Sequence, residues 1–179
     1  MFTVYRCVIC EEAYLGTEKP GRCPFCGAAT QYIFEQKDYP EPVRPELSPT
    51  SRKNVEATLG FEVSNASFYQ CAADKAKAAG KSWHYAMWKR LSRVESEHAS
   101  IAAKLLGIAV PPLDCNANPC STDFAENLTA AAARETNAST HYRQFKTESV
   151  EPRLVEIFTA LIEIEQDHLG LETRLKNSL

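Results

Sequence analysis

Hydrophobic and polar residues recur with the spacing of α-helices almost throughout the chain from about Ser51 onward. Glycine and proline interrupt this pattern at positions where helices usually begin or end. The pattern predicts four long helices, over residues 51–79, 82–106, about 122–148 and about 152–176. Two connections between them are short, whereas residues 107–121 form a long, irregular connection that contains three prolines.

The long middle connection decides between two helical architectures. In a simple up-down series every connection is short, whereas a ferritin-like bundle crosses over once and runs up-down-down-up. The predicted fold class is therefore an all-α ferritin-like four-helix bundle over residues 51–179, preceded by a small separate module.

The first part of the chain has a different character from the helical part. Residues 1–37 are rich in turns and hold four of the seven cysteines. Residues 38–50 are rich in proline, which removes backbone donors and favours an extended, semi-rigid spacer. We expect a small metal-binding domain over residues 1–37, a linker over 38–50 and the bundle over 51–179.

Composition narrows the class of protein. With 179 residues the chain can hold one good core and a small satellite module, and its formal net charge of −3 argues against a nucleic-acid surface. The N-terminus lacks the apolar run of a signal peptide, and no uncharged apolar stretch of about 18 residues could span a membrane. We expect a cytoplasmic protein without a nucleic-acid or membrane partner.

The four N-terminal cysteines, Cys7, Cys10, Cys23 and Cys26, have the spacing C-x2-C-x12-C-x2-C. Each pair bends into a knuckle that offers two thiolates, and two knuckles form a tetrahedral sulfur cage. Cysteines in a reducing cytosol are more often metal ligands than disulfides. The spacing predicts one iron or zinc ion, and it leaves open whether that ion relays electrons or only folds the module.

Two Glu-x-x-His sequences, Glu95–His98 and Glu165–His168, lie in the second and fourth predicted helices. Residues three apart share a helix face, so each sequence projects a carboxylate and an imidazole together. Taken alone, the two sequences are more easily interpreted as solvent-facing charge. If they face each other in a bundle, they can hold two metal ions, provided that the other two helices each add a glutamate.

Both additional glutamates have good candidates. On the first helix Glu62 is preferred to Glu56, because the apolar neighbours of Glu62 imply a buried position. On the third helix Glu135 ends an alanine-rich run and lies away from the helix ends. Tyr69, two turns after Glu62 on the same face, is placed to donate a hydrogen bond to a ligating carboxylate. Together with the cysteine module, these residues favour a centre with two metal ions.

The remaining histidines and the tryptophans have simpler interpretations. We expect His84 to be a packing or surface residue, and Trp83 and Trp88 to make core or dimer contacts. His141 follows Glu135 by about two turns, and we interpret it as a neighbour of the site more readily than as a member.

The three cysteines of the helical part are not expected to bind metal. Cys71 is interpreted as a small buried apolar residue. Cys115 and Cys120 form a C-x4-C pair in the long connection, for which a structural role is favoured and a reversible disulfide stays open.

Residues 5–10 (Tyr-Arg-Cys-Val-Ile-Cys) and 16–27 (Gly-Thr-Glu-Lys-Pro-Gly-Arg-Cys-Pro-Phe-Cys-Gly) resemble the short rubredoxin domain of rubrerythrins, which binds one iron and relays electrons. The helical part resembles the same family, because Glu95 and His98 fall at the family's distances from Glu62. The resemblance spans nearly the whole chain, with the rubredoxin-like module first. That domain order is called reverse rubrerythrin.

The chain departs from the rubrerythrin pattern at two positions. Glu11 follows the second cysteine, where the family usually has a glycine that lets backbone N–H groups approach the sulfurs. Ala138 stands one turn after Glu135, where the family usually has a further glutamate that takes over one iron from the second-helix histidine. We therefore expect His98 to stay bound in both oxidation states.

The resemblance implies a di-iron peroxidase that reduces hydrogen peroxide to water. Its electrons would come from an NAD(P)H-linked reductase through one iron in the cysteine cage, and the protein would be a homodimer. The implied site residues are Glu62, Glu95, His98, Glu135, Glu165 and His168 as ligands, with Tyr69 beside them. The absence of a carboxylate at Ala138 keeps a bacterioferritin-like iron-oxidising or oxygen-reducing function as the alternative. A non-enzymatic metal-binding or sensing module, with zinc in the cage, is a third.

Overall fold

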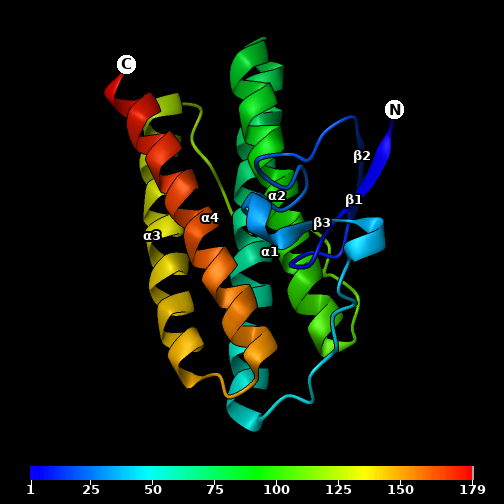
Figure 1. Cartoon of the computed structure of the whole chain (residues 1–179). Helices are drawn as coiled ribbons and strands as arrows, with labels where there is room; N and C mark the ends of the chain where they lie inside the picture. The colour runs from blue at the N-terminus through cyan, green and yellow to red at the C-terminus, as the bar shows by residue number, and fades with distance from the viewer. Residues whose placement is uncertain (179) are drawn as a thin grey trace.

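The structure, a computed structural model, describes residues 1–178 and consists of four long helices beside a small module that contains a sheet (Figure 1). Each helix begins and ends within about two residues of the range that the sequence pattern predicts. The helices are α1 (Pro49–Ala78), α2 (Ser82–Leu106), α3 (Phe124–Glu148) and α4 (Pro152–Asn177). The predicted four-helix bundle with a small N-terminal module is therefore confirmed.

The helices run up-down-down-up, as Figure 1 shows, because the connection between α2 and α3 returns along the length of the bundle. α1 packs along α2, α3 packs along α4, and α1 also contacts α3. This arrangement turns one face of every helix toward a common interior.

Local residues explain where the helices begin and end. The side chains of Ser48 and Asp123 cap α1 and α3 by accepting hydrogen bonds from the backbone N–H groups of Ser51 and Glu126. Gly107 ends α2 in the left-handed conformation, with φ of 70°.

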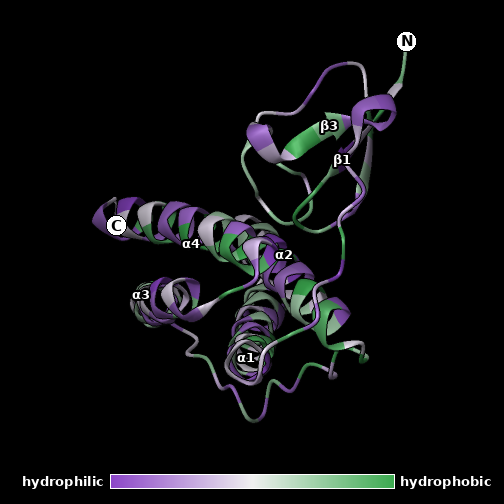
Figure 2. Cartoon of the chain, turned by 60° about the horizontal axis from the view of Figure 1, so that its bottom comes forward, coloured by the Kyte–Doolittle hydropathy of each residue, from purple (hydrophilic) through white to green (hydrophobic). Residues whose placement is uncertain are grey.

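The N-terminal module is a three-stranded antiparallel sheet with the order β2-β1-β3. Its strands are β1 (Thr3–Cys7), β2 (Ala13–Gly16) and β3 (Ile33–Glu35), and two 3-10 turns flank β3 at Thr30–Tyr32 and Gln36–Asp38. Figure 2 shows the module lying against α2 and α4, on the side of the bundle away from α3.

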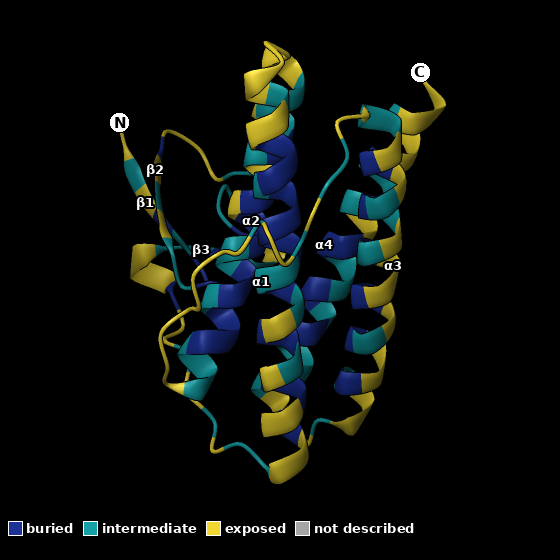
Figure 3. Ribbon diagram, turned by 180° about the vertical axis from the view of Figure 1, so that it is seen from behind, coloured by how far each residue is buried: buried dark blue, intermediate teal, exposed yellow. Residues whose placement is uncertain are grey.

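The hydrophobic core continues from the module into the bundle. Buried Ile9 and Ile33 of the module belong to the same cluster as Ile157 and Ile164 of α4. Figure 3 shows the buried residues on the inward faces of the helices and exposed residues on the outer faces and at the ends. None of the helices within residues 1–178 has both the length and the apolar composition needed to cross a membrane.

The long connection between α2 and α3 is attached to α1 by a disulfide between Cys71 and Cys120, whose Cα atoms are 6.0 Å apart. The expectation that Cys71 is merely a small buried apolar residue is therefore wrong. The disulfide between Cys115 and Cys120 that the sequence left open does not form, because Cys120 pairs with Cys71. Cys115 is a free thiol that contacts the Ser67 carbonyl. Helical periodicity could not predict this pairing, because it depends on how the connection lies across α1.

Candidate metal centres

All six residues proposed as metal ligands in the bundle meet in its interior. α1 contributes Glu62, α3 contributes Glu135, and α2 and α4 contribute the two Glu-x-x-His sequences. The four carboxylates and His98 are fully buried, and the side chain of His168 is 11% exposed. Residues three apart on α2 and on α4 lie on the same inward face, which explains why each pair arrives together.

Two groups of four residues bring their ligand atoms within 4.8 Å of one another: Glu62, Glu95, His98 and Glu165, and Glu95, Glu135, Glu165 and His168. Glu95 and Glu165 belong to both groups. His98 Nδ1 lies 3.1 Å from Glu95 Oε2 and 3.4 Å from Glu165 Oε1. His168 Nδ1 lies 3.0 Å and 3.2 Å from the other oxygen of each of these carboxylates. Glu95 and Glu165 would therefore help to hold a metal ion in each group.

The remaining two carboxylates are held by tyrosines in a crossed arrangement. The Tyr69 hydroxyl of α1 donates to Glu135 of α3, and the Tyr142 hydroxyl of α3 donates to Glu62 of α1. Each tyrosine follows the glutamate of its own helix by seven residues. The role of Tyr69 was anticipated from the sequence, whereas Tyr142 was not. The repeated Glu-x6-Tyr spacing is the signal that could have identified it.

Burial and mutual repulsion determine the electrostatics of this cluster. Burial, reinforced by the charge of Glu95, raises the pKa of both Glu62 and Glu135 well above the usual range. Burial alone would lower the pKa of His98 and His168, but the surrounding carboxylates, Glu95 foremost, together outweigh burial and raise the pKa of both. These raised pKa values mean that protons offset the carboxylate charge, a role that bound metal ions would take over.

Several buried oxygens of the cluster have no hydrogen-bond partner among residues 1–178. They are Oε2 of Glu62, Oε1 of Glu95, Oε2 of Glu135 and both carboxylate oxygens of Glu165. Buried polar atoms in folded proteins are normally paired, so oxygens that converge without partners point to a bound cation. Carboxylate oxygens with one imidazole at each end suit a pair of iron ions.

The four cysteines of the module also converge on one point, with their Sγ atoms within 4.8 Å of one another. The Sγ atoms of Cys7 and Cys26 are 3.8 Å apart, and those of Cys10 and Cys23 are 3.7 Å apart. A tetrahedral ion with metal–sulfur bonds of about 2.3 Å places its sulfurs about 3.8 Å apart. The cage therefore has the size of a single four-thiolate metal site.

One hydrogen bond connects the cage directly to the cluster. His98 Nε2 lies 2.9 Å from the backbone carbonyl oxygen of Cys26. Because a carbonyl oxygen only accepts, Nε2 carries a hydrogen, and Nδ1, which faces the carboxylates, is the nitrogen of His98 that could bind a metal ion. A cage cysteine and a cluster histidine are thus in contact within one chain.

Cationic side chains of the bundle hold the module in this position. Lys104 donates to the carbonyl of Cys10 at 2.7 Å, Arg153 donates to the carbonyl of Val8, and Arg90 donates to that of Pro24. Positive charges that donate to the knuckle backbone also offset the negative charge of four thiolates.

A sequence model of the rubrerythrin family matches residues 53–176, which include all six cluster residues. The chain belongs to the rubrerythrin family. It is 32% identical over 114 residues to reverse rubrerythrin-1 of Clostridium acetobutylicum. That alignment covers 59% of this chain and 63% of the relative, so the chain spans a little under two thirds of the relative's length.

Membership of the rubrerythrin family establishes the coarse identity of the protein. The predicted ferritin-like fold is confirmed, and the cysteine module precedes the bundle, as expected for the reverse order. The carboxylate–histidine cluster suits a di-iron centre, and the four-cysteine cage suits a rubredoxin-like iron site. The chain is a di-iron protein of the rubrerythrin family.

The two departures from the rubrerythrin pattern have clear positions in the structure. Glu11 adopts the left-handed conformation with φ of 70°, which glycine adopts at less cost, and its carboxylate lies 3.8 Å from Arg153. Ala138 is buried and lines a cavity of about 340 Å³ between α1 and α3, together with Phe61 and Asn65. None of the cluster residues lines this cavity.

A further buried carboxylate near the cluster was missed in the sequence. Glu172 of α4 is completely buried and lies 2.8 Å from the Tyr69 hydroxyl. It follows Glu165 by seven residues, the same spacing that separates each tyrosine from its glutamate. Periodicity places Glu172 on the inward face, but near the end of a charged helix this is a weak signal.

The other histidines and the tryptophans lie outside the cluster. His141 packs against Phe61 with ring centroids 4.8 Å apart, and His84 stacks on Phe124 at 3.8 Å. Trp88 is buried, whereas Trp83 is 55% exposed.

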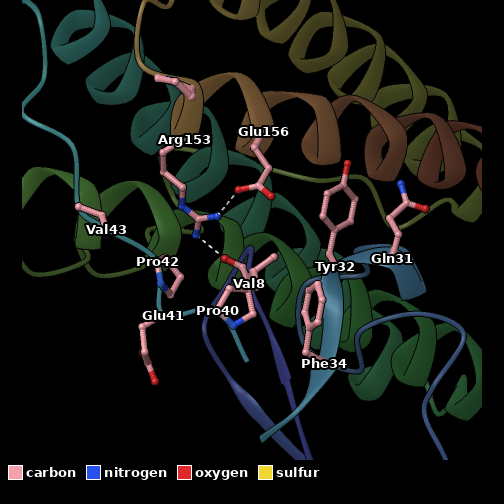
Figure 4. Close-up of a pocket in the computed structure, with 11 residues that line it drawn as sticks. Val8, Gln31, Tyr32, Phe34, Pro40, Glu41, Pro42, Val43, Arg153 and Glu156 are labelled. Carbon is pink, nitrogen blue, oxygen red and sulfur yellow. Dashed lines mark hydrogen bonds and ion pairs between the residues drawn. The ribbon is translucent and has the colours of Figure 1, made fainter. Parts of the chain in front are cut away.

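A cavity of about 600 Å³ lies at the junction of the module, the linker and α4 (Figure 4). Tyr32 and Phe34 form part of its wall, and none of the cluster residues lines it. Arg153, which reaches into this junction, already donates to the Val8 carbonyl and to Glu156 (Figure 4). The cavity therefore lies between the module, the linker and α4, and none of the proposed metal ligands lines it.

Proposed function

We propose that this di-iron protein reduces hydrogen peroxide to water and acts in the defence against oxidative stress. The observation that carries the proposal is the pair of shared carboxylates, Glu95 and Glu165, each of which faces both histidines. Reduction of peroxide consumes two electrons and two protons and yields two water molecules. Two ferrous ions held by these residues would supply both electrons to one O–O bond, so that no one-electron radical would be released.

We assign six residues as ligands of these ions: Glu62, Glu95, His98, Glu135, Glu165 and His168. Tyr69 and Tyr142 position the two terminal carboxylates by donating hydrogen bonds to them. Burial of the cluster excludes bulk water, and the acidic ligands favour the ferric product.

Electrons are proposed to return through the iron of the cysteine cage from an external NAD(P)H-linked reductase. The His98–Cys26 hydrogen bond supports a short route from the cage to the cluster. Because both residues belong to one chain, the route needs no second subunit, and the proposed homodimer contains it twice.

Metal analysis and rapid kinetics test this function. We expect iron in both sites, and the fully reduced protein should be oxidised faster by peroxide than by oxygen in anaerobic stopped-flow mixing. His168→Ala should abolish the fast phase. The matched control is His141→Ala, which removes a histidine outside the cluster and should keep the fast phase. Equal rates with oxygen and peroxide would contradict the peroxidase function, and zinc in the cage would contradict the electron relay.

The absence of a carboxylate at Ala138 favours one alternative function, the oxidation of ferrous iron as in bacterioferritin centres. With no carboxylate at this position the cluster offers four carboxylates and two histidines. Titration with excess ferrous iron separates the two functions. Repeated oxidation of more than two ferrous ions per chain would favour iron oxidation, whereas a peroxidase retains its ions.

A further inference from the structure

The first knuckle of the cysteine cage, residues 7–10, is held by two cationic side chains that belong to the bundle. Lys104, in the last turn of α2, donates to the Cys10 carbonyl at 2.7 Å. Arg153, the second residue of α4, donates to the Val8 carbonyl. Two helices of the bundle therefore each place one positive charge behind the same half of the cage.

Both cations are sheltered enough from water for their charge to act on the cage. The side chain of Arg153 is 12% exposed and that of Lys104 is 31% exposed. Solvent and salt screen exposed charges strongly, whereas partly buried charges are screened less. Arg90, which donates to the Pro24 carbonyl, is exposed and should contribute less than the other two.

Each of the two cations lies between two carboxylates. Lys104 Nζ is 3.2 Å from Glu12 Oε1 and 3.9 Å from Glu97 Oε1. The two carboxylates beside Arg153, at 2.7 Å and 3.8 Å, are those of Glu156 and Glu11. Removal of either cation would leave its carboxylates without compensation beside the cage. Loss of the positive charge and release of the negative charges would therefore act in the same direction.

Charge beside the cage matters because reduction of a bound iron adds one negative charge there. Four thiolates already outweigh the positive charge of ferric iron, so a nearby cation stabilises the ferrous form more than the ferric form. Net charge and hydrogen bonding around an iron–thiolate site are among the properties that set its reduction potential. Lys104 and Arg153 should therefore raise the reduction potential of the cage.

We propose that Lys104 and Arg153 couple reduction of the cage iron to docking of the module on the bundle. This proposal rests on the proposed electron relay, in which the external reductase supplies one electron and no bond forms or breaks. Because both cations belong to the bundle, they raise the potential only while the module is docked. The docked position is also the one in which the Cys26 carbonyl contacts His98. The cage therefore accepts an electron most readily where it touches the cluster.

Reductive titration of the iron-loaded protein tests the effect of the cations on the cage. The visible absorption of ferric iron bound to thiolates reports the cage alone, because the cluster contains no cysteine. At a fixed applied potential, Lys104→Gln should shift the ferric-to-ferrous ratio roughly tenfold toward ferric, the lower end for a group behind metal ligands. For one electron this factor lowers the midpoint potential by about 59 mV. Arg153→Gln should shift the ratio in the same direction.

Two further variants separate the charge of Lys104 from its effect on folding. Lys37→Gln is the matched control, because it removes the same charge from an exposed lysine of the module that pairs with Glu35. It should change the ratio by less than about twofold. Lys104→Arg keeps the charge and should keep the wild-type ratio. An unchanged ratio in Lys104→Gln, or equal shifts in Lys104→Gln and Lys37→Gln, would overturn the proposal.

Hydrogen exchange of the module amides tests the reciprocal effect. If docking favours the ferrous cage, thermodynamic linkage requires that reduction strengthens docking by the same factor. Reduction should therefore slow this exchange in wild type by at least about tenfold. In the double variant Lys104→Gln/Arg153→Gln the effect of reduction should fall below about twofold. Exchange in wild type that does not depend on the oxidation state would overturn the coupling.

These measurements separate failure of the coupling from failure of the proposed function. Neither measurement uses peroxide, so both can be made on iron-loaded protein even if that protein reduces no peroxide. If the purified protein carries zinc in the cage, the proposed electron relay fails, and titration after exchange of zinc for iron still decides whether the two cations act on the cage. A wild-type ratio in Lys104→Gln would overturn the coupling even if the protein reduces peroxide.

Discussion

Substitution of Ala138 by glutamate adds the carboxylate that the rubrerythrin pattern has at this position. Ala138 is 1% exposed, lies one helical turn after Glu135 and lines the cavity of about 340 Å³ between α1 and α3, which offers space for a longer side chain. We expect the added carboxylate to bind metal when metal is present. Without metal it should destabilise the bundle, because it joins a cluster that already holds four buried carboxylates.

The size of this loss follows from proton linkage. A new carboxyl group in this cluster can avoid its charge only by holding a proton, which costs about 1.36 kcal/mol for each pH unit above its ordinary pKa of about 4.3. At pH 7 the metal-free Ala138→Glu variant should therefore lose about 3.7 kcal/mol of unfolding free energy. Its folded-state pKa is raised, so this loss should be absent near pH 4 and should grow as the pH rises.

Urea denaturation followed by the helical circular dichroism signal measures this effect. The cage is kept loaded, and the cluster is either empty or filled with manganese(II), which accepts the same ligands and is not oxidised by air. Bound manganese should reduce the loss of unfolding free energy to below about 1 kcal/mol, because the added carboxylate then offsets the positive charge of the metal ions.

Ala133→Glu is the matched control, because Ala133 lines the same cavity but is exposed. It should change stability by no more than about 0.5 kcal/mol in either state. The same loss in Ala138→Glu with and without manganese would refute the reasoning, since it would show that the new carboxylate does not reach the metals. In the assembled protein, an unchanged peroxide rate would show that this position does not matter for the reaction.

Two further predictions concern the contacts that hold the segments together. Gly27 has a left-handed backbone, and the methyl group of Gly27→Ala would meet Ile164 of α4 at 3.3 Å, so this variant should speed hydrogen exchange of the module amides. The control Gly107→Ala carries a similar backbone strain of about 1–2 kcal/mol but has open surroundings, and it should leave the exchange of these amides unchanged. Equal exchange rates in the two variants would contradict the contact between the module and α4. Cys71→Ser opens the disulfide with Cys120, which closes a loop of 49 residues, and should cost about 4 kcal/mol in urea denaturation. A reductant should lower the unfolding free energy of wild type and of Cys115→Ser by the same amount and should not change that of Cys71→Ser. If the reductant does not destabilise wild type, the disulfide contributes little to stability.

The sequence was sufficient for the helices and for the inward face of each. Residues three or seven apart on a helix lie on the same face, so the spacing of Glu95 and His98 already fixes which way both side chains point. Apolar neighbours selected Glu62, and a position after an alanine-rich run away from the helix ends selected Glu135; the structure brings each of them together with Glu95 and Glu165. Their assignment as ligands is our proposal. The cage cysteines could likewise be grouped from spacing alone, because each knuckle is a local turn.

What the sequence left open are contacts between segments that are distant along the chain. Periodicity gives the face of a helix but not the neighbour that this face meets. Only the tertiary structure therefore decided that His98 contacts the Cys26 carbonyl and that Cys71 pairs with Cys120. Glu172 is the clearest case, because a glutamate near a helix end is ordinarily solvated. Packing of α4 against Tyr69 buries it, and burial raises the pKa of its carboxyl group to about 8.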